Sequence, residues 1–439
     1  MINSARIFPM KSSRSSSIRR LGIIDAVSLT VSSMVGAGIF TILALTVKTA
    51  QSDAVWAWVF IVVLSFPMAL SFSDLTGILA ESGGPYVFLR DHVSKRLGLF
   101  VAWSFWLSAQ GAASALLTAL IHMFFQMGLP FSTLIGISIV AILVIITAQG
   151  IHVGMMVQRV LTIFTLLLLV LSITLGLWHG ISQAVVIPHG KESLHLAQML
   201  HPHFGSPVWL ATFYAFWTYS GWEAVAVPSG SYKNQLALGR GMLIGSTLVG
   251  VLYILVAFAA VLALPTHLMA SSANPLVLIG AEYAPWLGHV IAWGAVAVVI
   301  SSLLSWMIST SSLTQSLIRD QLLPAPHAIK HHNGEFHRSL PFVTGLIITI
   351  VALLPLFSEA IAASSLTALI PYAIVFIAVS FHKTADWSGL LSSSWWRRGL
   401  ALLATITALM LIIFSGIHNL IPTLILLLLG AILVLIRNN

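Results

Sequence analysis

The 439-residue sequence contains no cysteine and few charged residues. Without cysteine, disulfide bonds and thiolate metal sites are excluded. Charged residues make up 7% of the chain and hydrophobic residues 58%, whereas a typical soluble domain is about 25% charged. So few charges cannot cover the surface of a soluble protein of this size, and so much apolar sequence excludes a disordered chain. The mean hydropathy of +0.99 therefore indicates a membrane protein with little mass outside the bilayer.

Twelve apolar stretches are long enough to cross a bilayer as helices, which takes about 20 residues each. They lie at 22–48, 54–80, 98–128, 131–150, 155–179, 207–230, 240–264, 285–316, 340–358, 360–382, 398–417 and 420–436. Together they account for most of the chain. The sequence therefore predicts an all-α integral membrane protein without a separate soluble domain.

The basic residues are distributed unevenly between the predicted connections. Eighteen of the twenty Lys and Arg lie in the two tails or in even-numbered connections, and the exceptions are Lys48 and Lys191. Because basic residues are retained on the cytoplasmic side, we expect a multi-pass protein of the cytoplasmic (inner) membrane with both termini in the cytoplasm. Residues 1–20 form its basic tail. The net charge of +8 is then a topology signal, and nucleic-acid binding is not expected.

The first predicted span contains two glycines near its middle, in the run Val35-Gly36-Ala37-Gly38-Ile39-Phe40. A glycine costs about 1 kcal/mol in a helix interior relative to alanine. Local unwinding would free N–H groups at the start of the following half-helix, and such groups bind carboxylates. Close helix packing through small residues explains the motif equally well.

The sixth span has a comparable interruption, Trp217-Thr218-Tyr219-Ser220-Gly221-Trp222-Glu223. A carboxylate at the centre of a membrane helix costs about 2.5–3.5 kcal/mol on insertion scales, which makes Glu223 the candidate functional acid and proton-coupling group. A protonated Glu223 bonded within the bundle is the structural alternative. Interruptions five spans apart are typical of transporters built from two inverted five-helix repeats.

Four motifs, in order, resemble segments of the amino acid–polyamine–organocation (APC) transporter family, and most closely those of basic amino acid and polyamine antiporters. Residues 36–40 resemble its GxGIF motif. The other three matching segments are Asp74-Leu75 with Glu81-Ser82-Gly83-Gly84-Pro85-Tyr86, then Phe216 to Glu223 with Tyr232-Lys233-Asn234-Gln235, and finally Ser305-Trp306-Met307 with Arg319-Asp320-Gln321-Leu322-Leu323-Pro324. The matches cover residues 20 to about 345.

The resemblance implies a LeuT-like fold. Its ten-helix transport core spans 21–382, with 21–179 and 207–382 as the two inverted halves, and 398–436 adds two further transmembrane helices. It implies a permease, a secondary active transporter that moves an amino acid or related amine by alternating access. No cofactor is implied, and a homodimer is compatible with the family.

The resemblance also implies where the substrate binds. Backbone N–H groups of Ala37 and Gly38 would hold its carboxylate, and nearby carbonyls its ammonium. Trp217 and Trp306 would stack on its side chain, although core packing is the alternative for any one of the fourteen tryptophans. The substrate-binding residues expected are Met34, Val35, Gly36, Ala37, Gly38, Ile39, Gln110, Ser114, Trp217, Thr218, Ser220, Gly221 and Trp306.

Two departures from the family pattern leave the substrate and the coupling open. Proton-coupled members often carry a lysine on the fifth span, where this chain has Thr165. Arginine exchangers use an asparagine on the third span, where this chain has Ala113, so arginine is not supported. Coupling could use sodium at the hydroxyls of Ser305 and Ser309, or protonation of Glu223, or exchange could need no ion. Those hydroxyls could equally bond back to their own helix.

Two other classes of function compete with transport. A sensor or channel on the same fold is compatible with the sequence. A membrane-embedded enzyme would need converging acids, histidine pairs or a nucleophile motif, and the acids within the spans are nearly confined to Glu223. No enzymatic activity and no metal site is therefore expected. An Arg319–Asp320 ion pair is expected to help close the cytoplasmic side.

Overall fold

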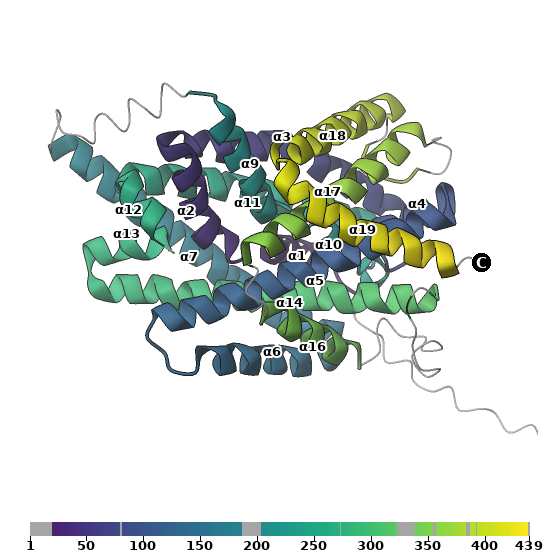
Figure 1. The fold of residues 1–439 in the computed structure, drawn as a ribbon, viewed down its shortest axis with the longest axis horizontal. Helices are drawn as coiled ribbons and strands as arrows, with labels where there is room; N and C mark the ends of the chain where they lie inside the picture. Colours follow the sequence, from purple (N-terminus) through teal and green to yellow (C-terminus); the bar gives the residue numbers. More distant parts are fainter. Residues whose placement is uncertain are drawn as a thin grey trace, which may run out of the picture.

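A computed structural model shows the chain as a bundle of long helices (Figure 1). The structure describes residues 20–79, 81–186, 203–272, 274–321, 323, 339–353, 357–382, 387–391 and 393–437. The basic tail before residue 20 lies outside the described residues. Apart from one isolated parallel bridge between Leu21 and Tyr232, the regular elements of the described chain are helices.

Most of the twelve apolar stretches form one α-helix each. These helices are α3 (Ala54–Leu75), α5 (Lys95–Gln126), α6 (Ser132–Ala148), α7 (Ile151–Val186), α11 (Gln235–Ala263), α14 (Pro285–Arg319), α16 (Leu340–Ala352), α17 (Phe357–Phe381), α18 (Ser394–Phe414) and α19 (Ile417–Arg437). The first and sixth stretches are each split in two, into α1 (Ile23–Met34) with α2 (Gly38–Ala50) and α9 (Ser206–Tyr219) with α10 (Trp222–Ala226). The predicted interruptions of these two stretches are thus confirmed.

Seven helical segments of the described chain are long and apolar enough to cross a membrane, and four shorter apolar helices accompany them. The predicted all-α membrane architecture is therefore confirmed. Most helix ends lie close to the predicted ones, but α7 continues past the predicted end at residue 179, and α16 ends at Ala352, before the predicted end at residue 358. The twofold relation between the two halves remains a prediction.

Short helices between the spans were not predicted. They are α4 (Pro85–His92), α12 (Thr266–Ser271), α13 (Pro275–Tyr283) and the 3-10 turns η1 (Gln51–Asp53), η2 (Thr76–Ile78) and η3 (Ser229–Ser231). The first of these, α4, follows Gly84, which has a positive φ of 72°, and it starts with Pro85 in its first turn. Proline suits that position because its missing N–H would have no helical partner.

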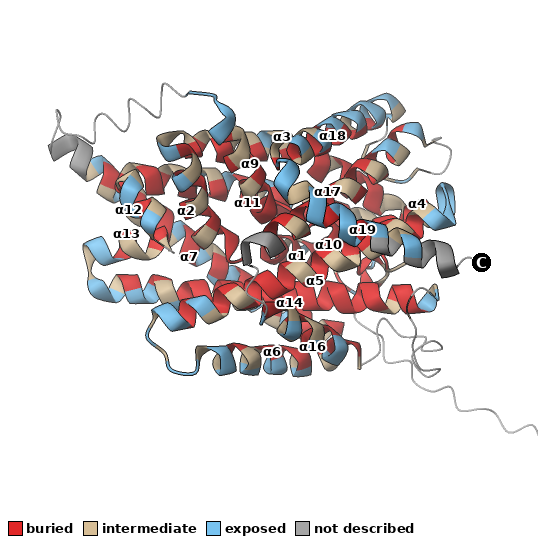
Figure 2. Cartoon of the chain, in the orientation of Figure 1, coloured by how far each residue is buried: buried red, intermediate tan, exposed pale blue. Residues whose placement is uncertain are grey.

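The burial of the helices separates an interior from a rim. The most apolar 18-residue segment of each helix is buried inside the protein to 78% in α14 and to 72% in α5. In α18 the corresponding share is 39%. Figure 2 shows the same contrast, with buried residues along α14 and exposed ones on α6, α18 and α19. Large apolar side chains such as Ile142 and Leu428 are more than half exposed on the rim. An exposed apolar rim of this kind suits contact with lipid acyl chains rather than with water.

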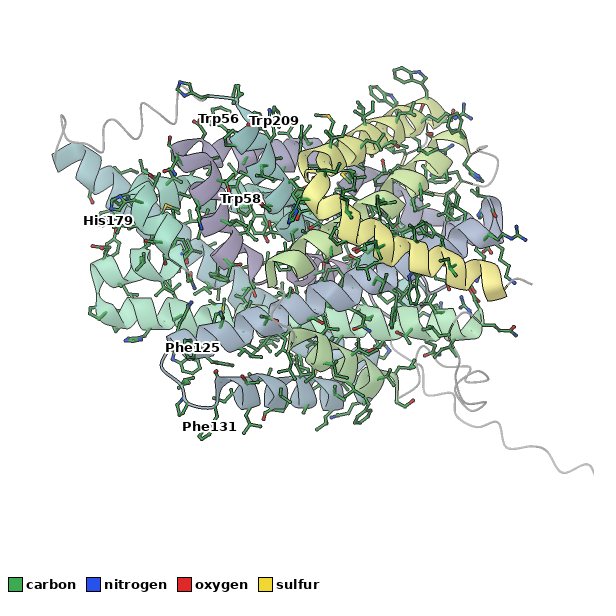
Figure 3. The ribbon with its side chains drawn as sticks, viewed as in Figure 1. Trp56, Trp58, Phe125, Phe131, His179 and Trp209 are labelled. Atoms are coloured by element: carbon green, nitrogen blue, oxygen red, sulfur yellow. The ribbon has the colours of Figure 1, made fainter. Side chains whose placement is uncertain are left out.

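Aromatic side chains gather at the helix ends. Phe125 and Phe131 lie exposed around the turn between α5 and α6, and Trp56 and Trp209 lie near each other at another edge (Figure 3). Between the two tryptophans, the ring of Phe60 stacks on Trp209 at 5.0 Å. Aromatic residues at helix ends are typical of the bilayer interface.

Candidate functional site

The break in the first span consists of Val35, Gly36 and Ala37. Val35 has extended backbone angles and ends α1, while α2 starts without a side-chain cap. The first backbone bonds of α2 are donated by Phe40 and Thr41 to the carbonyl of Ala37. The N–H groups of Gly38 and Ile39 therefore have no acceptor within α2, and they lie at the positive end of its dipole.

The break in the sixth span consists of Ser220 and Gly221. Gly221 has a φ of 122°, which side-chain-bearing residues rarely adopt. A Cβ at this position would also lie 3.2 Å from the hydroxyl oxygen of Ser33 in α1. The glycine thus allows both the turn and the close approach of the two interrupted helices.

Tyr253 of α11 joins the two breaks. Its hydroxyl lies 2.8 Å from the carbonyl oxygen of Met34 and 3.2 Å from that of Thr218. Each of these carbonyls belongs to the last turn before a break, where no helical N–H reaches it. Tyr253 is fully buried, so its bonds are shielded from water and fix the two helix ends relative to each other.

A small central cavity lies between the breaks. Its volume is about 20 Å³, room for little more than one water molecule. The residues lining it are Ser33, Met34, Gly36, Gly38, Ser108, Ala112, Leu116, Trp217, Thr218, Ser220, Ser302, Trp306 and Ser364. The two interrupted helices, α5, α14 and α17 therefore all contribute to one enclosed space.

Seven of the residues expected to bind substrate line this cavity: Met34, Gly36, Gly38, Trp217, Thr218, Ser220 and Trp306. The other six, which are Val35, Ala37, Ile39, Gly221, Gln110 and Ser114, do not. Gln110 is buried in α5, and its amide atoms have no partner among the described residues. Ser114 donates back to the carbonyl of Gln110 at 2.7 Å. On α5 the cavity instead meets Ser108, Ala112 and Leu116, another face of the helix.

Glu223 lies in the first turn of α10 and is 2% exposed. Tyr372 of α17 donates a hydrogen bond to its Oε2 atom, and Oε1 has no partner among the described residues. Glu223 does not line the cavity. The ring of Tyr372 packs edge-on against Phe72 at 4.7 Å, within a group of aromatic side chains. The sequence carried no signal for Tyr372 as the partner of Glu223.

The serines of α14 hold the interrupted helices in place. Ser305 donates to the carbonyl of Leu29 in α1 at 3.4 Å, and Ser309 to that of Ala224 in α10 at 2.6 Å. One turn earlier, Ser301 donates to the hydroxyl of Ser32 at 3.0 Å and accepts from the amide of Gln158 at 2.8 Å. The hydroxyls proposed for sodium thus serve as links between helices.

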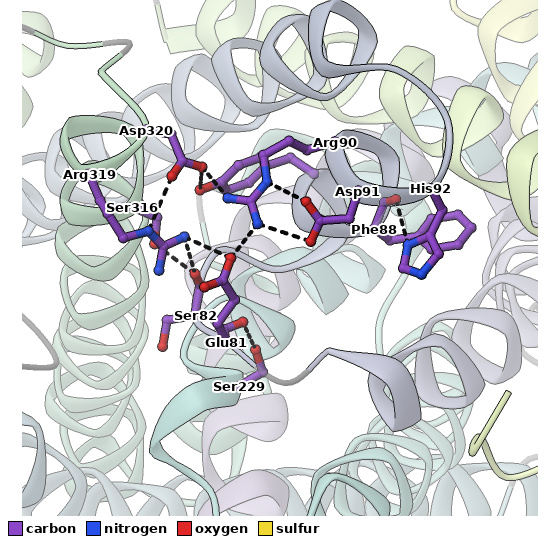
Figure 4. Close-up of polar contacts among 11 residues, drawn as sticks. Glu81, Ser82, Phe88, Arg90, Asp91, His92, Ser229, Ser316, Arg319 and Asp320 are labelled. Atoms are coloured by element: carbon purple, nitrogen blue, oxygen red, sulfur yellow. Dashed lines mark hydrogen bonds and ion pairs between the residues drawn. The ribbon is translucent and has the colours of Figure 1, made fainter. Parts of the chain in front are cut away.

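A polar network joins α4 to the end of α14 (Figure 4). Arg90 lies at its centre, with ion pairs to Glu81, to Asp91 at 2.6 Å and to Asp320 at 2.5 Å. The bond from Arg90 holds the pKa of Asp91 below its ordinary value. Arg319 adds contacts of 3.2 Å to Glu81 and to Asp320. The sequence predicted the Arg319–Asp320 contact but missed Arg90, which makes the larger number of ion pairs.

The family profile described as "Amino acid permease" matches residues 21–436. The chain belongs to the amino acid permease family. Over 360 residues this permease is 25% identical to a putative amino-acid transporter of Methanocaldococcus jannaschii, across 81% of its own length and 89% of that protein. It is 26% identical over 363 residues to an arginine/agmatine antiporter of Chlamydia pneumoniae, which covers 79% of this permease and 74% of the antiporter. It is 24% identical over 336 residues to the serine/threonine exchanger SteT of Bacillus subtilis, 72% of each chain.

The resemblance to APC transporters is thereby confirmed. The permease is a multi-pass membrane transporter for a small-molecule substrate, and it is not an enzyme. These relatives do not agree in substrate by name, so the substrate must be argued from the cavity.

Proposed function

We propose that this permease exchanges amino acids across the inner membrane by alternating access, with the substrate held between the two helix breaks. The observation that carries the proposal is the enclosed cavity lined by both interrupted helices. The free N–H groups of Gly38 and Ile39 at the start of α2 suit a carboxylate. Carbonyls at the ends of α1 and α9 suit an ammonium. An α-amino acid carries both groups on one carbon and matches this pairing.

The Arg90 network keeps one side of the permease closed. This network ties α4 and the loop before it to the end of α14, on the side that the distribution of basic residues assigns to the cytoplasm. With this side closed, substrate enters the cavity from outside once the outer side opens. Separation of Arg90 from its carboxylates then opens the inner side. In this orientation both termini are cytoplasmic.

Exchange without ion coupling is the mode we favour. The serines considered for sodium donate to protein carbonyls, and Glu223 lies outside the lining of the cavity. Two of the relatives are named as an antiporter and an exchanger. Proton coupling is the second candidate, because the Tyr372–Glu223 bond buries a carboxyl group beside the second break.

Counterflow into proteoliposomes tests the proposal. Purified protein is reconstituted with unlabelled amino acids inside and trace labelled amino acids outside, without sodium and at equal pH on both sides. We expect labelled amino acid to enter loaded vesicles and not empty ones. Entry into empty vesicles only under an imposed pH gradient would establish the second candidate instead. Absence of entry for every amino acid and polyamine would contradict amino acid transport.

A further inference from the structure

Helices α5, α14 and α17 line the central cavity together with the two breaks, and Leu116 and Ser302 approach Gly36 of the first break. Ser108, Ala112 and Leu116 follow one another at a spacing of four residues, so they form a single stripe along α5. Ser364 of α17 is hydrogen-bonded to Ser108 of this stripe, and Trp306 of α14 also lines the cavity. Since the breaks would hold the carboxylate and ammonium of an amino acid, this part of the wall would meet its side chain.

The described residues of this wall carry no formal charge. Burying an ammonium, a guanidinium or a carboxylate without a partner of opposite charge is strongly unfavourable. Glu223, the nearest acid by sequence to the second break, is bonded to Tyr372 and does not line the cavity. The wall therefore suits an uncharged side chain.

Ser108 and Ser364 form a reciprocal pair. The hydroxyl of Ser108 donates to the carbonyl of Ser364 at 2.9 Å, and the hydroxyl of Ser364 donates to the carbonyl of Ser108 at 3.0 Å. A serine hydroxyl has one hydrogen and two lone pairs. Both hydrogens are already used, so the pair can accept a hydrogen bond from a substrate but cannot readily donate one.

Ser302 provides the complementary group. Its hydroxyl is buried, borders the cavity and has no hydrogen-bond partner among the described residues. A Cβ at Gly36 would lie 2.8 Å from this hydroxyl oxygen, so Ser302 reaches the first break. A buried polar group without a partner is costly, and a bound polar substrate would satisfy it.

Resting on the exchange function proposed above, we propose that the permease selects a small, uncharged amino acid and favours one with a side-chain hydroxyl, such as serine or threonine. That hydroxyl donates to the acceptor pair Ser108–Ser364, and Ser302 bonds the polar backbone end of the substrate. The cavity of about 20 Å³ must widen for any amino acid, and a long side chain would have to displace Leu116 and Trp306 further than a short one.

Competition against labelled serine in gradient-free counterflow tests the substrate class. Unlabelled serine, threonine, alanine, phenylalanine, lysine, arginine and agmatine are added outside in turn. We expect serine, threonine and alanine to compete, in that order of strength or with serine and threonine equal. Exchange of arginine or agmatine in preference to serine would overturn this inference while leaving amino acid exchange intact. Counterflow is therefore repeated with each compound as the label, and its absence for every label would instead overturn the proposed exchange.

The variants Ser108→Ala and Ser364→Ala test the acceptor pair. Each should lower the preference for serine over alanine by about five-fold, the effect of one ordinary hydrogen bond, through KM rather than kcat. The matched controls are Ser104→Ala on α5 and Ser365→Ala on α17. Both remove a buried hydroxyl that donates within its own helix and is not part of the cavity wall.

The controls should keep the wild-type ratio of serine to alanine. An unchanged ratio in both Ser108→Ala and Ser364→Ala, with exchange of alanine intact, would overturn the role of the pair. If one of these two variants does not assemble, the other is tested alone. The thermal shifts that serine and alanine induce in it then report its preference for serine over alanine.

Discussion

The hydroxyl of Tyr253 lies 2.8 Å from the carbonyl oxygen of Met34, the last residue of α1. The same hydroxyl lies 3.2 Å from the carbonyl of Thr218 near the end of α9. One buried side chain thus holds the ends of both interrupted helices, which would otherwise present unpaired carbonyls next to the cavity. The substrate proposed here meets a site whose two halves are already aligned.

Tyr253→Phe removes this link without changing the shape of the side chain. We expect the affinity for substrate to fall by about ten-fold, because one or two buried hydrogen bonds of about 1 kcal/mol each are lost. Tyr219→Phe is the control, since Tyr219 donates a buried bond to the carbonyl of Ser246 away from the cavity. Equal losses in the two variants, measured as the Kd of labelled substrate, would argue against an aligning role.

Gly38→Val places a branched side chain at the start of α2. Even a Cβ here would overlap the side chain of Thr218 and lie 3.3 Å from the ring of Trp217. We expect substrate binding to be abolished while the protein still assembles, as size-exclusion chromatography will report. Gly399→Ala, at a glycine with open space around it, should bind as the wild type does. Unaltered affinity in Gly38→Val would refute binding at the first break.

Glu223→Gln separates the two coupling modes. The glutamine retains an acceptor for Tyr372 but cannot exchange a proton. If transport is ion-independent exchange, counterflow persists and its dependence on pH is that of the wild type. A pH profile that becomes flat in the variant would assign the coupling proton to Glu223.

Arg90→Ala should open the cytoplasmic side more than Arg319→Ala does. Arg90 pairs with three carboxylates, and its side chain is 19% exposed against 39% for Arg319. Because the chain has no cysteine, Ser316→Cys can be introduced as the single reporter and labelled with a maleimide. We expect Arg90→Ala to raise the labelling rate several-fold. Equal labelling in the two arginine variants would show that Arg90 is not the centre of the closure.

The same reporter tests the pH dependence of the network. The pKa of Asp91 is lowered in the folded protein by the bond from Arg90. The pair therefore contributes in full above the unfolded value of about 3.9 and is lost only as the pH falls below it. The labelling rate depends on the thiolate fraction of the reporter, which itself rises with pH, so the rate is divided by that of the Arg90→Ala variant at the same pH. This ratio should be flat between about pH 5 and 8. A change in the ratio within that range would mean that another group controls the closure.

The sequence predicted the helix breaks because their cause is local. Glycines and polar residues inside apolar runs weaken a helix wherever it packs. The first break contains Gly36 and ends at Gly38, and the second consists of Ser220 and Gly221. The count of long apolar stretches was likewise sufficient for the all-α membrane fold.

The identity of the residues that line the cavity depends on which face of each helix turns inward. On α5 the sequence favoured Gln110 and Ser114, whereas the cavity meets Ser108 and Ala112. A helix that is apolar on nearly all sides gives no periodic signal that fixes its rotation. Partners far apart in the chain, such as Tyr253 with Met34, carry no sequence signal either, because each looks like ordinary core.

Gradient-free counterflow of labelled serine tests the central claim most directly. Proteoliposomes loaded with unlabelled serine are compared with empty ones, without sodium and at equal pH inside and outside. Exchange through the central cavity predicts a transient accumulation of label in the loaded vesicles, none in the empty ones, and none with Gly38→Val. Equal uptake into loaded and empty vesicles, or full activity of Gly38→Val, would contradict it.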